Sequence, residues 1–318
     1  MRMSKSRLEN PLTAGSLLQD NGLSEALKKD EAFQVLSKIR SSSAFWKKEQ
    51  SNLMAMIRQQ GTPALFVTLS VAETKWPELL VDISEEDACN LPHEEKARIL
   101  KNTWKPPHGS FGNFSIKDYY YRIEFQHRGS PHAHMMLWLE GAPSINFETT
   151  DPVVKEANRR DVCAFVDTVM TSNAHHPDFD DNFKELVVSR QHHHHTKTCF
   201  KKNKKIQSCR FAIPIFPMDE TIVLDPLPNR NNSDYARWGK QVRKYLEDNY
   251  DTLGSSDLTF NQFINIFDLG KSDYIMAVRS TLKMSKIFLK RELKHACVNQ
   301  FNSKILRMHR ANIDIQYI

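Results

Sequence analysis

Two stretches of alternating apolar and polar residues flank a turn in the middle of the chain. In residues 119–126, and again in residues 132–139, an apolar side chain occupies every second position. A period of two is typical of a β-strand with one buried face. The intervening residues, 127–131, read His-Arg-Gly-Ser-Pro, and Gly, Ser and Pro favour turns. The pattern therefore predicts a β-hairpin.

The polar positions of this hairpin predict a metal site. If the strands pair with Gln126 opposite His132, antiparallel register places Glu124 opposite His134, and all four side chains share one face. Two imidazoles with a carboxylate and an amide oxygen can bind a divalent cation, and the oxygen ligands favour Mg²⁺ or Mn²⁺. A His-x-His pair alone is more typical of ordinary exposed or buried histidines than of a metal site. The facing acid and amide favour the metal site.

The remaining apolar pattern predicts an α+β fold. Residues 64–70 form a strongly apolar run that predicts a central strand. Residues 141–155 contain two prolines and predict a loop. Apolar residues at helical spacing predict helices over residues 24–58, 160–170, 233–248, 258–267 and 274–281. We expect helices to flank an antiparallel sheet built from residues 63–71, 117–126 and 132–140.

A second group of candidate ligands lies within residues 187–214. Two histidines of the run His192 to His195, together with Cys199 and Cys209, would make the tetrahedral ligand set of a structural Zn²⁺. A fortuitous histidine run is the simpler alternative. Four lysines between the cysteines form either a solvated loop or a set of phosphate contacts; they are Lys201, Lys202, Lys204 and Lys205.

Composition narrows the class of protein. A chain of 318 residues that is 40% apolar can form one large or two modest domains. Its net charge of +6 is a mild basic bias that permits nucleic-acid binding. No run of 18 apolar residues predicts a membrane span, and no apolar stretch follows the N-terminus as in a secretory signal. An odd count of five cysteines favours a reducing compartment over a disulfide scaffold.

The sequence segments around the hairpin resemble those of a known protein family. His132-Ala133-His134, followed by apolar residues, resembles the His-hydrophobic-His signature of the HUH endonucleases. Residues 122–139 closely resemble the Rep domain of Helitron transposases, often described as Helitron helicase-like proteins, and the resemblance runs from about residue 10 to residue 318. Residues 191–199 are similar to the zinc-finger-like element of that family, whose His-x-His-Thr-x-Thr-Cys pattern favours His193 and His195 as the zinc ligands.

The resemblance implies an architecture and a function. The expected architecture is an antiparallel HUH/Rep palm-like sheet flanked by helices, with a zinc-finger-like insertion and a helical C-terminal region. The expected function is metal-dependent nicking and strand transfer of single-stranded DNA in the nucleus, with Arg128 and the four lysines as DNA contacts. The corresponding regions are 1–60 (N-terminal helices), 61–145 (palm), 146–185 (helical connector), 186–222 (zinc element) and 223–318 (C-terminal helices).

The resemblance also implies a nucleophile that these residues do not show. In Helitron Rep domains two tyrosines, one helical turn apart, follow a short motif that residues 312–316 resemble. The present sequence reaches residue 318 before such a pair of tyrosines. We therefore expect no catalytic residue here and no nicking by the chain alone. One alternative is a non-catalytic zinc-containing DNA-binding protein derived from a transposon. Another is a nuclease that uses water, which would need more acidic residues near the histidines. The sequence predicts no oligomeric state.

Overall fold

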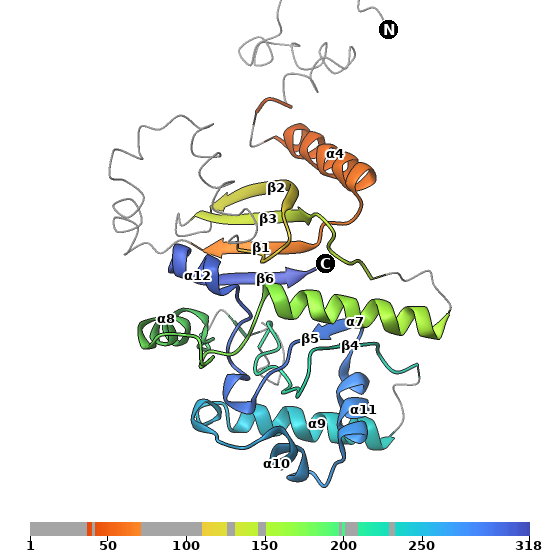
Figure 1. Cartoon of the computed structure of the whole chain (residues 1–318), viewed down its shortest axis with the longest axis vertical. Helices are drawn as coiled ribbons and strands as arrows, with labels where there is room; N and C mark the ends of the chain where they lie inside the picture. Colours follow the sequence, from red (N-terminus) through yellow and green to blue (C-terminus); the bar gives the residue numbers. More distant parts are fainter. Residues whose placement is uncertain are drawn as a thin grey trace, which may run out of the picture. The chain divides into compact units, whose positions relative to one another are not determined.

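The computed structural model describes residues 37–39, 42–70, 110–125, 131–145, 151–196, 199–200, 209–228 and 233–318 (Figure 1). The chain divides into two units, Met1–Thr62 and Pro63–Ile318. The described residues form a mixed fold of seven α-helices, a four-stranded antiparallel sheet and a separate two-stranded sheet. The predicted α+β class is therefore confirmed at this level.

The first unit contains helix α4, which spans Ser43–Gln60. The hydroxyl of Ser42 accepts a hydrogen bond from the amide of Phe45 at 3.0 Å, which caps the first turn. The helix stops at Gly61, whose φ of 82° suits a residue without a Cβ. Within the described residues, α4 accounts for the second half of the helix predicted over residues 24–58.

The second unit is built around the four-stranded sheet, whose strands lie in the order β2-β3-β1-β6. All neighbouring pairs are antiparallel. The strands span Leu65–Ser70 (β1), Ile116–Phe125 (β2), Pro131–Leu139 (β3) and Ile313–Tyr317 (β6). Strand β1 is an inner strand, as its apolar run predicts. The edge strand β6 is an addition to the three predicted strands.

One face of this sheet forms the main core. Alternate residues of β1, β3 and β6 have no exposed surface: Leu65, Val67, Leu137, Ile313 and Ile315. They belong to one cluster with apolar residues of the surrounding helices. Burial of each aliphatic side chain contributes about 1.5–3 kcal/mol, so this face fixes which way the sheet is turned. The alternate residues consequently point to the opposite face.

The hairpin pairs in a register that differs from the predicted one by two residues. Glu124 lies opposite His132 instead of opposite His134. The prediction was wrong because Pro131, which was assigned to the turn, pairs with Phe125 and begins β3. Proline is tolerated at the first residue of a strand, where no amide donor is needed. A slip of two residues keeps every side chain on its predicted face.

Helix α7 begins eight residues before its predicted start at residue 160, because it spans Pro152–Val169. The prediction of a loop over residues 141–155 was therefore wrong from Pro152 onward. The carboxylate of Asp151 accepts a hydrogen bond from the amide of Val153 at 2.8 Å. Pro152 occupies the first turn, where its missing amide hydrogen costs nothing, so it starts this helix.

Asn302 joins three segments of the main core. It is buried, and its side-chain oxygen caps the following helix by accepting from the amide of Ile305 at 3.0 Å. Its side-chain nitrogen donates to the carbonyls of Ser110 at 2.6 Å and Val169 at 2.7 Å. These bonds satisfy a buried amide and join the start of α12 (Ser303–His309) to the end of α7. Helix α8 (Asp181–Gln191) contributes further apolar residues to this core.

A second hydrophobic cluster lies among the C-terminal helices. Tyr274 is fully buried in it and donates its hydroxyl hydrogen to the carbonyl of Pro217 at 2.9 Å. The surrounding elements are β4 (Ile222–Leu224), α9 (Ser233–Asp248), η3 (Leu253–Ser255), α10 (Phe260–Asn265), α11 (Lys271–Thr281), β5 (Lys286–Phe288) and η4 (Leu293–His295). Helix α9 coincides with the predicted helix over residues 233–248.

The close approach of α9 to α11 gives a test of this packing. A Cβ on Gly239 would lie 2.6 Å from the carbonyl oxygen of Ala277, which is backbone and cannot rotate away. Alanine gains about 1 kcal/mol of helix propensity over glycine, but overpacking costs about 1–3 kcal/mol. We expect Gly239→Ala to lower the free energy of unfolding measured by urea titration. Gly254→Ala, whose Cβ would meet nothing within 4 Å, is the control. A stabilised Gly239→Ala protein would contradict this packing.

Candidate metal centres

The sheet face opposite the core carries polar side chains from all four strands. The pairing registers of β1 with β3 and β6, and of β2 with β3, place these residues side by side. Two rows cross the face, Arg122-His134-Thr68-Asp314 and Glu124-His132-Ser70. Directly opposite residues in such rows have Cβ atoms about 4.5–5.5 Å apart, so these side chains can act on one ligand.

His134 has polar partners on both ring nitrogens. Its Nε2 atom lies 3.0 Å from Oε2 of Glu124, a diagonal neighbour on β2. Its Nδ1 atom lies 3.1 Å from the Thr68 hydroxyl on β1. The ring also stacks on Phe66, with 5.9 Å between centroids. The imidazole is therefore held in one orientation, with Glu124 on the same side of the sheet.

His132 repeats this arrangement one row further along. Its Nδ1 atom lies 3.3 Å from the Ser70 hydroxyl, and its ring is nearly parallel to that of His134, with centroids 6.5 Å apart. Glu124 lies opposite it on β2. The structure thus brings together the two predicted histidines and the predicted acid. Gln126, which was expected opposite His132, and Arg128 lie outside the described residues.

Strand β6 adds residues that the sequence analysis did not select. Asp314 lies opposite Thr68 on the histidine face, and burial raises the pKa of its carboxyl group. At the end of the preceding helix α12, the Nε2 atom of His309 donates to the carbonyl of Ser70 at 2.6 Å. The alternation of Ile313 and Ile315 with polar residues was the available signal for a strand here. It covers only five residues, which is short for a pattern argument.

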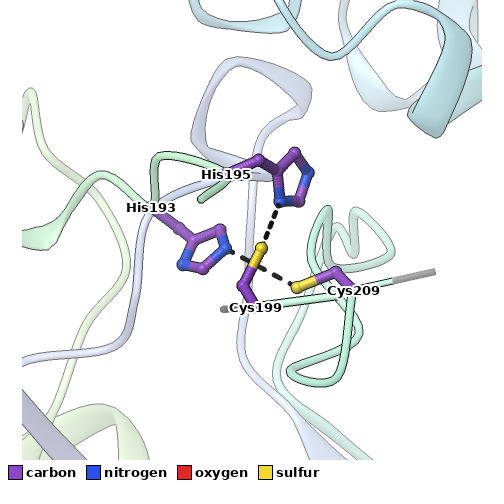
Figure 2. Close-up of side chains that lie close together, drawn as sticks. All are labelled: His193, His195, Cys199 and Cys209. Atoms are coloured by element: carbon purple, nitrogen blue, oxygen red, sulfur yellow. Dashed lines mark hydrogen bonds between the residues drawn. The ribbon is translucent and has the colours of Figure 1, made fainter. Parts of the chain in front are cut away.

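The four predicted zinc ligands lie together in a second place (Figure 2). One ligand atom from each of His193, His195, Cys199 and Cys209 falls within 4.8 Å of all the others. The Nδ1 atom of His195 lies 3.3 Å from Sγ of Cys199, and Nε2 of His193 lies 3.6 Å from Sγ of Cys209. Figure 2 shows the two rings and the two thiols turned toward one another. This cluster could hold a metal ion.

Backbone contacts with distant segments hold this cluster in place. The amide of His193 donates to the carbonyl of Cys297 at 2.8 Å, and its carbonyl accepts from the hydroxyl of Tyr250. The Tyr250 ring also packs on His195, with centroids 4.2 Å apart. A bridge between Phe200 and Cys209 brings the second cysteine back to the first. The cluster is therefore assembled from the end of α8, the turn after α9 and the segment after η4.

The electrostatic surroundings keep the two clustered histidines neutral. Burial lowers the pKa of His193 to about 4, with a further decrease from the neighbouring imidazoles. Burial also lowers the pKa of His195. A neutral imidazole is the form that binds a metal ion. His192 and His194 lie outside the cluster, and the four predicted DNA-contact residues Lys201, Lys202, Lys204 and Lys205 lie outside the described residues.

The tyrosines near the histidine face are not activated as nucleophiles. Tyr119 and Tyr121 alternate onto the opposite face of β2 and stack on each other. Tyr120 shares the histidine face, but burial raises its pKa and its hydroxyl oxygen accepts from Nε of Arg122. Tyr317 donates to the carbonyl of Pro143, and burial raises its pKa to about 12. A raised pKa disfavours the attacking phenolate.

Comparison with known proteins agrees with the sequence resemblance in the N-terminal part. The family model described as the Helitron helicase-like domain at the N-terminus matches residues 3–137, which contain β1, β2 and the two histidines of β3. No curated protein and no solved structure matches the chain. Among the described helices, none combines the length and the apolar character needed to cross a membrane. Over residues 3–137 this chain is similar to the Helitron helicase-like N-terminal domain family, which supports the resemblance found in the sequence.

Proposed function

We propose that this chain derives from a Helitron-type rolling-circle transposase and forms its Rep, or HUH, domain. The proposed lineage activity is metal-dependent nicking and strand transfer of single-stranded DNA in the nucleus. The observation that carries the proposal is the position of His132, His134 and Glu124 on one sheet face, with contact between the acid and one imidazole. The family match over residues 3–137 supports it independently.

The ligand chemistry of this face fits a divalent cation such as Mg²⁺ or Mn²⁺. Two imidazole nitrogens and a carboxylate oxygen leave several positions open for water or a phosphate oxygen. When bound, such a cation polarises and orients a phosphate group. The residues of the chain orient the ligand atoms: the stacked Phe66 and the β1 hydroxyls hold the imidazoles, and Glu124 is placed to exchange its histidine contact for the cation.

The same face offers groups that suit single-stranded DNA. The Arg122 guanidinium lies 5.3 Å from the ring centroid of Tyr120 and shares a row with His134. Guanidinium groups bind phosphate strongly. The net charge of +6 favours the same partner.

The Cys/His cluster is proposed to bind a structural Zn²⁺. Two thiolates and two imidazoles are a ligand set that zinc takes tetrahedrally, and no ligand position is left for a substrate. The cluster is bonded through His193 to the turns at Tyr250 and Cys297. The proposed role of the ion is to hold these segments in register.

The second candidate is a non-catalytic, zinc-containing DNA-binding protein derived from a transposon. The tyrosines favour it, because those on the histidine face or beside the sheet have raised pKa values or bonded hydroxyls. In such a protein the zinc cluster and the basic residues would serve DNA binding, and the histidine face would be a remnant of the transposase. The two candidates differ in whether the sheet binds a cation.

Metal analysis of variants tests both centres. We expect the purified wild-type chain to contain about one zinc per chain and to bind Mn²⁺ in electron paramagnetic resonance titrations. Cys199→Ala removes a thiolate and should abolish the zinc, whereas His132→Ala should abolish Mn²⁺ binding and retain the zinc. His194→Ala and His176→Ala, which delete imidazoles outside both centres, are the matched controls. Equal zinc content in Cys199→Ala and wild type would contradict the assignment of the cluster.

An experiment that measures DNA binding and traps covalent protein–DNA adducts tests whether the chain alone lacks nicking activity. With Mn²⁺ and a labelled single-stranded oligonucleotide, we expect binding whose logarithmic affinity falls with log salt by about 0.7 per phosphate neutralised. We expect no covalent adduct on denaturing gels, because Tyr120 and Tyr317 have raised pKa values and bonded hydroxyls. Arg122→Gln should weaken binding, whereas Lys244→Gln on the exposed side of α9 should not. A covalent adduct would overturn the inactivity, and absence of any binding would overturn the DNA partner.

A further inference from the structure

Each imidazole of the sheet contacts a hydroxyl group on the neighbouring central strand. Nδ1 of His134 lies 3.1 Å from the Thr68 hydroxyl, and Nδ1 of His132 lies 3.3 Å from the Ser70 hydroxyl. Thr68 and Ser70 are the direct pairing partners of these histidines on β1. The two contacts are therefore repeated features of the strand register, two residues apart.

We propose that Thr68 and Ser70 are positioning residues that hold each imidazole by its Nδ1 atom, so that both Nε2 atoms are the metal-binding atoms of the sheet. This inference rests on the proposed cation site and goes further by assigning the ligand atoms and the residues that select them. A metal-bound imidazole generally donates its other N–H to a fixed partner, which sets the ring orientation and raises the basicity of the ligand nitrogen. Here the Thr68 and Ser70 hydroxyls are the partners to which each Nδ1–H would donate when a cation is bound.

A hydroxyl is suited to this role because it can both donate and accept a hydrogen bond. Without a cation, Nε2 of His134 faces the Glu124 carboxylate at 3.0 Å, so that nitrogen carries the proton and the Thr68 hydroxyl donates to Nδ1. With a cation on Nε2, the ring proton would reside on Nδ1 after exchange with solvent, and the Thr68 hydroxyl would rotate to accept a hydrogen bond from Nδ1–H. No side chain has to leave its rotamer, and the proton count of the ring is unchanged.

The position of the hydroxyls on β1 makes this arrangement rigid. The adjacent residues of the same strand, Leu65 and Val67, are fully buried in the core, and β1 pairs on both sides with β3 and β6. A strand fixed in this way cannot shift its hydroxyls relative to the imidazoles. The same register places Asp314 opposite Thr68 on β6.

Variants that remove or retain each hydroxyl test the inference. Thr68→Val keeps the side-chain shape and removes the hydroxyl, and we expect it to weaken Mn²⁺ binding by about tenfold. Ser70→Ala should weaken binding in the same direction, and Thr68→Ser, which retains a hydroxyl, should recover most of the affinity. Thr168→Val on α7, whose hydroxyl donates to the carbonyl of Ala164, is the matched control and should leave the dissociation constant unchanged.

A spectroscopic readout separates tautomer selection from general destabilisation. In long-range ¹H–¹⁵N spectra of the wild-type chain saturated with diamagnetic Mg²⁺, we expect a protonated Nδ1 and an unprotonated Nε2 for His132 and His134. In Thr68→Val the His134 signals should show a mixture of tautomers, while thermal unfolding controls for folding. This measurement on the wild type needs no variant to fold.

The outcomes separate this inference from the proposed function. Failure of the wild-type chain to bind Mn²⁺ or Mg²⁺ at the sheet would overturn both. Binding by the wild type with Nδ1 as the unprotonated, metal-bound nitrogen would overturn the tautomer assignment alone. Unchanged Mn²⁺ dissociation constants in both Thr68→Val and Ser70→Ala would likewise overturn it while leaving the cation site intact.

Discussion

The pairing of β1 with two neighbours is the constraint on which the rest of the second unit depends. One face of this strand places Leu65 and Val67 in the core, and the other places Thr68 and Ser70 beside the imidazoles. Because strand side chains alternate strictly, the core cannot be packed without also fixing the polar face. Burial on one side of β1 is therefore what orients the proposed cation site on the other.

The two candidate centres differ in their degree of assembly, and the difference matches their proposed roles. In the Cys/His cluster all four ligand atoms lie within 4.8 Å, and distant segments close around it. On the sheet the two rings are 6.5 Å apart, and the acid contacts only one of them. Structural metal sites are closed by protein ligands, whereas sites that act on substrates keep positions open. The sheet centre has the open geometry.

The sequence predicted the elements whose signals are local. The hairpin, the inner strand over residues 64–70 and helix α9 follow from periodicity alone, because a strand or helix with one buried face repeats its apolar residues regularly. The joint position of His193, His195, Cys199 and Cys209 followed from ligand spacing together with the family resemblance. These predictions needed no information about which distant segments meet.

The errors come from residues whose meaning depends on context. Pro131 and Pro152 were both interpreted as turn or loop residues, yet one begins β3 and the other begins α7. Proline is tolerated at the first position of either element, so its presence alone does not distinguish a break from a beginning. Strand β6 joins the sheet only through pairing with residues more than 240 positions earlier, which no local pattern reports.

Asn302 has a consequence for how the second unit opens. Its side chain ties the segment after η4 to the carbonyls of Ser110 and Val169, and the chain continues from it into α12 and β6. Detaching the edge strand therefore requires breaking buried amide bonds that also hold the start of the hairpin region and the end of α7. We therefore expect β6 to exchange its amide hydrogens slowly, together with the end of α7, and not to fray as an isolated edge.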